Sequence, residues 1–130
     1  MRSISTPSEM PALLSEFPRA VEPYRVHCDG DWFDIPGGSR VSCRHRTHLR
    51  RLLKALAHHR VQHPGEPIKA DALFAVGWPD ERIEQRSARN RLKVAMSTLR
   101  KMGFGATLLG DRDGYRLKQE IPVEVVRPMA

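Results

Sequence analysis

Three side chains in the second half of the sequence, Arg86, Asn90 and Lys93, have the chemistry needed to recognise nucleic-acid bases. Arg and Lys donate hydrogen bonds to the acceptors of guanine, and the amide of Asn matches adenine. On a helix that turns about 100° per residue, these three share a face with Val94 and Ser97, and Val94 could contact a thymine methyl group. We therefore expect base contacts from one helix face, made by Arg86, Asn90, Lys93, Val94 and Ser97.

Further cations flank this face and suit phosphate groups better than bases. They are Arg89, Arg91, Arg100 and Lys101. Arg112 stands at the tip of an expected hairpin and could enter a narrow minor groove, although Asp111 and Asp113 beside it oppose DNA at close range. Arg116, on the following strand, could reach a phosphate instead. The alternatives are an ordinary solvated helix face and a turn that is polar only for solubility.

The charge distribution favours a polyanionic partner. The formal net charge is +7 at pH 7, and the acids are segregated from much of the basic charge. Residues 35–65 and 85–110 contain no Asp or Glu, whereas they carry seven and six Lys or Arg residues respectively. This segregation indicates one positive face rather than a uniformly basic surface.

The elements that must position these residues follow from periodicity and turn signals. Short strands that alternate in polarity are expected at 24–28, 32–35 and 40–43, separated by Asp29-Gly30 and by Pro36-Gly37-Gly38. Helices are expected at 47–62, at 70–76, and from 83–87 to 102, with Gly103 as the cap of the last. A hairpin pairs 107–109 with 115–117, and 121–126 either extends a sheet or trails off. Asp71 is expected to be an N-cap or first-turn acid.

The order is therefore sheet, three helices, hairpin, in a single domain at 24–126. Residues 1–23 are rich in Ser and Pro, so we expect a mobile arm with at most one helical turn at 10–17, and a short tail at 127–130. The fold class is α+β, a winged helix-turn-helix with a small N-terminal antiparallel sheet, three helices and a C-terminal β-hairpin wing.

Several motifs in this order resemble the OmpR/PhoB-type winged-helix effector domain of bacterial response regulators. The motifs are Leu52-Leu53, His63-Pro64-Gly65-Glu66, the LFAVGW segment from Leu73 to Trp78, Leu99-Arg100-Lys101, and Asp113-Gly114-Tyr115-Arg116-Leu117. The resemblance spans residues 24–117 and implies that the third helix reads DNA while the wing contacts the adjacent minor groove or backbone. Residues 1–23 are too short for the family's receiver domain, and the polar face of the third helix differs from the usual pattern. We therefore do not transfer phosphorylation control or base preference.

The resemblance also implies that only the start of the first helix lies near the DNA backbone. Arg44, Arg46 and His48 are accordingly further candidates for phosphate contacts, whereas Arg50, Arg51 and Lys54 are solvated or face a protein. In this family the loop between the second and third helices can contact RNA polymerase. Its acids here, Asp80, Glu81 and Glu84, suit either such a contact or simply the dipole at a helix N-terminus.

The remaining chemistry does not favour catalysis or a cofactor. No nucleophile–base pair, phosphate-binding glycine loop or catalytic carboxylate pair is evident, so we expect no enzyme activity. Cys28 and Cys43 are expected to be reduced, half-buried strand residues. Two histidine sets could suggest zinc, and the more compact comprises Cys43, His45 and His48, but we expect no metal. Trp78 is expected in the core, and Tyr115 at the base of the wing.

These observations favour a cytoplasmic, DNA-binding transcriptional regulator that is a monomer or weak dimer. The sequence contains no apolar run of the length needed to span a membrane. Its N-terminal residues include no apolar h-region, so we expect no secretory signal. The alternative is a winged-helix protein-interaction module or adaptor, which the acids of residues 77–85 and the exposed Val94 support. RNA binding is less favoured because few aromatic residues are available for stacking.

Overall fold

The structure is a computed structural model that describes residues 22–128. The predicted helical turn at 10–17 and nearly all of the predicted arm therefore lie outside the described residues. Residues 127 and 128 follow the last strand without regular structure, as expected for the start of a tail.

The first part of the chain forms the predicted antiparallel strands, and the end of the chain adds a fourth. β1 (Tyr24–His27), β2 (Trp32–Asp34) and β3 (Arg40–Ser42) pair in sequence order, with Phe33 opposite both Val26 and Val41. β6 (Val123–Val126) pairs parallel to β1, which gives the order β3-β2-β1-β6. Residues 121–126 therefore extend the sheet rather than trailing off.

Three α-helices follow the first three strands. α2 (Thr47–Gln62) has the predicted bounds and stops before His63-Pro64-Gly65, whose proline cannot continue a helix. α3 (Ala70–Gly77) carries Asp71 in its first turn, and its N-cap is Lys69, so the first-turn alternative for Asp71 is the correct one. α4 (Gln85–Leu99) is the helix that carries the candidate base-reading residues.

The end of α4 differs from the prediction of a regular helix to Met102. The α-helix ends at Leu99 and widens into a π-helical turn, η2 (Arg100–Phe104), followed by a 3₁₀ turn, η3 (Gly105–Thr107). Gly103 adopts φ 151°, a value that side chains disfavour, and an added Cβ would meet Ile35 of the sheet at 2.6 Å. The glycine thus allows the helix end to approach the sheet closely.

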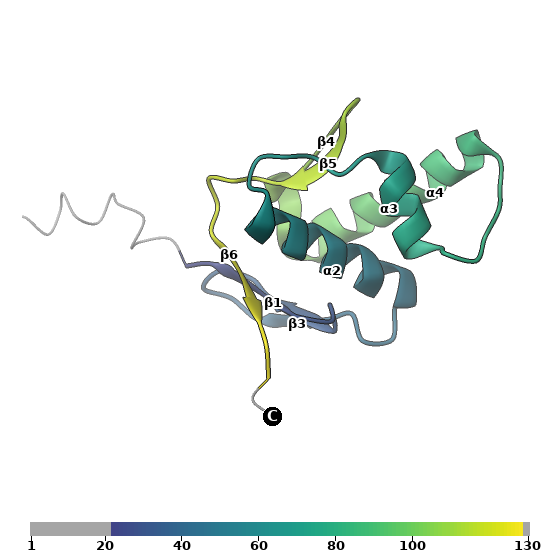
Figure 1. The fold of residues 1–130 in the computed structure, drawn as a ribbon. Helices are drawn as coiled ribbons and strands as arrows, with labels where there is room; N and C mark the ends of the chain where they lie inside the picture. Colours follow the sequence, from purple (N-terminus) through teal and green to yellow (C-terminus); the bar gives the residue numbers. More distant parts are fainter. Residues whose placement is uncertain (1–21, 129–130) are drawn as a thin grey trace, which may run out of the picture.

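α2 is the centre of the fold and separates the sheet from α3 and α4 (Figure 1). Its predicted leucine stripe is buried, as expected from the i, i+3, i+4, i+7 spacing. The stripe comprises Leu49, Leu52, Leu53 and Leu56. Phe33 and Phe104 stack with ring centroids 4.4 Å apart and join the sheet to the turn after α4.

The terminal hairpin rises from the side of α2 away from the larger sheet (Figure 1). β4 (Leu108–Asp111) and β5 (Gly114–Leu117) pair across Arg112 and Asp113, as the Asp-Gly signal predicted. Backbone hydrogen bonds between Ile68 and Tyr115 tie the hairpin to the segment before α3. The described residues are therefore α+β, with three α-helices and two small sheets.

Candidate nucleic-acid interface

The outer face of α4 presents the five candidate base-reading residues. Arg86, Asn90, Lys93 and Val94 are exposed, Val94 by 59%, and Ser97 is half-buried. The opposite face packs into the core, and its predicted members Leu92, Ala95, Met96 and Leu99 are buried, with Ala88 half-buried. The predicted division of α4 into an apolar face and a polar face is confirmed.

The wing tip lies beside the N-terminal half of α4. Arg89 of α4 and Arg112 of the hairpin line one surface depression, together with Lys69 just before α3. The same depression contains carboxylates, from Glu66, Asp71 and Asp113. The structure therefore brings Arg89, at the edge of the exposed face of α4, and the tip of the hairpin to one side of the molecule.

The acids next to Arg112 have a local structural role. The Asp111 carboxylate accepts the backbone N–H of Asp113 at 2.7 Å, which closes an Asx turn at the hairpin tip. Turn geometry therefore explains why an acidic residue stands at position 111. It also leaves the Arg112 side chain exposed at the tip.

Three predicted phosphate-binding arginines are engaged or enclosed within the protein. Arg91 forms an ion pair with Glu81 from the loop that precedes α4. Arg100 is half-buried, and its Nε donates to the carbonyl oxygen of Leu108 at 2.9 Å, which fixes the start of β4 to the end of α4. Arg116 is also half-buried, with its Nη1 atom enclosed. Phosphate binding by Arg91 or Arg100 would require breaking those contacts. The enclosed Nη1 atom of Arg116 has no hydrogen-bond partner within the described residues.

Among the candidate cations of α4, the turn after it and the wing, five others are exposed and form no ion pair within residues 22–128. They are Arg86, Arg89, Lys93, Lys101 and Arg112. We call this set the free cation set. Because their side chains are not committed to carboxylates of the described fold, they can meet phosphates without first losing an internal partner.

The candidates at the start of α2 divide into two groups. Arg44 and Arg46 are exposed, and Nη1 of Arg46 lies 3.9 Å from Sδ of Met102, beside the end of α4. His48 instead joins α2 to α3, since its Nδ1 lies 2.8 Å from the Gly77 carbonyl oxygen and its ring stacks on Trp78 at 4.8 Å. A carbonyl can only accept a hydrogen bond, so Nδ1 must carry the proton in this contact. The phosphate contact considered for His48 would compete with this packing role.

The predicted packing aromatics lie where expected. Trp78 is buried in the core, between His48 and Phe74, and Tyr115 is half-buried against the core at the wing. In the loop before α4, Asp80, Glu81 and Glu84 are exposed. Glu84 occupies the N-cap position of α4, where a negative charge interacts favourably with the helix dipole.

The cysteines are free thiols, but their surroundings differ from the prediction of two half-buried strand residues. Cys43 is fully buried immediately after β3, and desolvation raises the pKa of its thiol, with nearby Arg46 opposing the shift. Cys28 is half-buried and lies in the turn after β1 rather than in the strand. There it lies close to His27 and Asp29, a cluster of metal-ligating side chains that was missed by sequence reasoning.

Comparisons of the chain with protein-family models, curated proteins and solved structures find no match. Within the part of the chain that the structure describes, no helix has both the length and the apolar character needed to cross a membrane.

Proposed function

We propose that this chain is a winged-helix protein that binds duplex DNA and regulates transcription. The observation that carries the proposal is the shared position of Arg89 and Arg112, because it places the polar face of α4 and the hairpin tip on one side. The order of sheet, α2, α3, α4 and hairpin is also that of the OmpR/PhoB-type domain, which the sequence motifs resemble. α3, its loop and α4 then correspond to the helix-turn-helix.

In this proposal α4 enters the major groove. Arg86, Asn90 and Lys93 face base edges, while Arg89 and Lys101 bind phosphates on both sides of the groove. Arg112 at the wing tip approaches the adjacent minor groove or backbone. Arg44 and Arg46, at the start of α2, extend the set of phosphate contacts. Ionic contacts of this kind supply most of the non-specific affinity of DNA-binding proteins.

The proposed role is binding rather than catalysis, by a cytoplasmic protein that is monomeric or weakly dimeric. Among residues 22–128, the large hydrophobic side chains classed as exposed are Val61, Val76 and Val94. These valines lie on three different helices, Val61 on α2, Val76 on α3 and Val94 on α4. Isolated exposed valines are ordinary on monomers, whereas stable dimers need larger contiguous apolar patches.

A protein-interaction module is the second candidate. It is favoured by the 59% exposure of Val94 in the middle of the proposed reading face and by the ion pair that Glu81 makes with Arg91. In this role the loop before α4, with the α4 face beside it, would contact a partner such as RNA polymerase instead of DNA. The two candidates differ in whether naked duplex is bound at all.

A gel-shift titration with a random-sequence duplex over a salt series tests the proposal. We expect binding that weakens steeply as salt rises, because each phosphate contact releases counterions. The control is a duplex titration of a variant in which Arg86, Lys93 and Lys101 are replaced by Gln. Absence of duplex binding at low salt, or binding that salt does not change, would reject DNA binding and favour the interaction module.

A further inference from the structure

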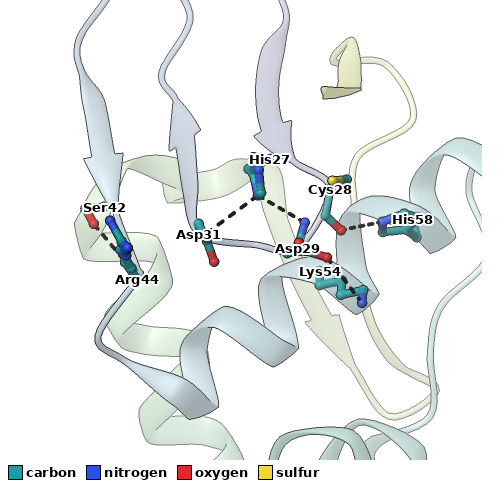
Figure 2. A network of polar contacts seen from close by, with 8 residues as sticks. All are labelled: His27, Cys28, Asp29, Asp31, Ser42, Arg44, Lys54 and His58. Atoms are coloured by element: carbon teal, nitrogen blue, oxygen red, sulfur yellow. Dashed lines mark hydrogen bonds and ion pairs between the residues drawn. The ribbon is translucent and has the colours of Figure 1, made fainter. Parts of the chain in front are cut away.

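The turn between β1 and β2 gathers three side chains of different ligand types. One potential ligand atom from each of His27, Cys28 and Asp29 lies within 4.8 Å of the other two. His27 and Cys28 are half-buried, and Asp29 is exposed. Figure 2 shows this cluster beside α2, with Lys54 and His58 directed toward the turn. It lies at the end of β1 and in the turn that follows, and it shares no residue with the proposed DNA surface.

We propose that this turn is a zinc site, with ligands from the imidazole of His27, the thiolate of Cys28 and the carboxylate of Asp29. Zn²⁺ binds this mixture of nitrogen, sulfur and oxygen donors, whereas Mg²⁺ and Ca²⁺ prefer oxygen alone. Bond lengths of about 2.0–2.3 Å place tetrahedral ligands about 3.5 Å apart. The ligand atoms lie within 4.8 Å of one another, so zinc binding requires them to approach by at most about 1.3 Å, which side-chain rotation can supply.

The surroundings of His27 favour a cation. Nδ1 of His27 accepts the backbone N–H of Asp29 at 3.2 Å and also lies 4.0 Å from a carboxylate oxygen of Asp31. A neutral imidazole has one lone pair in its ring plane, so a metal ion at Nδ1 takes the place of the Asp29 N–H. The nearby Asp31 carboxylate favours the positive charge that the metal brings. Asp31 is then the nearest carboxylate for the fourth position, which water fills otherwise.

The turn is already fixed in place by the rest of the fold. Nε2 of His58 lies 2.9 Å from the carbonyl oxygen of Cys28, and the backbone N–H of Cys28 donates to Val126 at 2.9 Å. Gly30 has φ 78°, and an added Cβ would lie 2.2 Å from the carbonyl oxygen of Arg50 on α2. A turn held in this way loses little conformational entropy when it binds a metal.

Besides the hydrogen bond from the Asp29 N–H to His27, an ion pair competes with the metal. Nζ of Lys54 lies 3.7 Å from Oδ1 of Asp29, and both side chains are more than half exposed. Exposed ion pairs of this kind are weak, so a metal ion can displace the ammonium group. Removing the positive charge of Lys54 should therefore strengthen zinc binding, whereas removing a ligand should weaken it.

The test is zinc affinity of the reduced full-length chain, measured by competition with a chromophoric chelator, together with the absorption spectrum of the Co²⁺-loaded protein. We expect one metal ion per chain and a thiolate-to-cobalt charge-transfer band. Cys28→Ser should abolish the band and weaken zinc binding by more than about 10-fold, because even outer-shell changes cost about 10–100-fold. Lys54→Met should tighten binding. Cys43→Ala is the control that removes the buried thiol and should keep the band.

His27→Gln and Asp29→Asn provide independent variants should Cys28→Ser fail to fold by circular dichroism. Both should weaken zinc binding, and His45→Gln, which changes an exposed histidine outside the cluster, should not. The proposal is overturned if the wild-type chain gives no cobalt–thiolate band. It is also overturned if zinc affinity is unchanged by the substitutions of the cluster.

Discussion

Replacing Arg89 and Arg112 together with Ala tests whether the helix and the wing contact one duplex. Each phosphate contact contributes about 0.9 to the slope of log affinity against log salt on B-DNA. The proposal has five phosphate contacts, from Arg44, Arg46, Arg89, Lys101 and Arg112. The slope is then about −4.5, and affinity falls about 500-fold from about 50 to 200 mM salt. Losing Arg89 and Arg112 reduces the slope to about −2.7 and the fall to about 40-fold.

The assay is fluorescence anisotropy with a labelled random-sequence duplex, repeated at several salt concentrations. The matched control replaces Arg25 and Arg40 with Ala, which lowers the net charge by the same amount on the larger sheet. That sheet lies on the other side of α2 from the wing (Figure 1), so the control slope should stay near the wild-type value. Equal reductions in both double variants would refute the reasoning, because overall charge and not this surface would then govern binding.

Three further predictions concern single features of the fold. Asn90→Ala should change the bases enriched when bound duplexes are selected from a random pool while leaving the salt slope unchanged, and an unaltered preference would exclude Asn90 from base reading. In the native, metal-free protein, iodoacetamide should label half-buried Cys28 much faster than Cys43, because Cys43 is fully buried and burial raises the pKa of its thiol. Mass spectrometry of the digest measures the two rates, and equal labelling would contradict this prediction. The hydrogen bond and charge of Arg40 lower the pKa of Asp34 in the folded protein. The ion pair therefore stabilises the fold fully above the ordinary pKa of Asp, and this stabilisation is lost as pH falls through the lowered pKa of Asp34. Arg40→Leu should therefore raise the pKa of Asp34 in an NMR titration, and an unchanged pKa would contradict this cause.

Local patterns were sufficient for the elements that position the candidate interface. The leucines of α2 repeat at helical spacing, and His63-Pro64-Gly65 follows the last residue of the helix, so both the helix and its end were predictable. The Asp-Gly signal predicted the hairpin tip in the same way. The outer face of α4 followed from periodicity alone, since only one side of that helix can pack on the core.

Contacts between distant segments were not predictable from such patterns. The parallel pairing of β6 with β1 joins the two ends of the domain, and nothing within 121–126 specifies that partner. Similarly, the pairing of Arg91 with Glu81 depends on how the loop folds back on α4, and the enclosure of Arg116 depends on the packing of the wing. Arg100 likewise bonds to the start of the wing. Sequence alone does not distinguish Arg91, Arg100 and Arg116 from the free cation set, whereas these contacts in the fold do.

The zinc-site cluster was missed for a different reason. Consecutive residues of a strand point to opposite faces, so His27 and Cys28 would diverge if the strand ran to Cys28 as predicted. The strand ends instead at His27, and the turn begins at Cys28. This one-residue difference allows adjacent side chains to converge with Asp29.

Amide hydrogen exchange of the full-length chain, measured with and without a saturating random-sequence duplex at low salt, tests the central claim most directly. DNA binding through this surface should slow exchange in residues 85–101 and 108–117, and should leave exchange in β2 and β3 unchanged. Protection centred on β2 and β3, or no protection anywhere in the presence of duplex, would contradict the proposed interface.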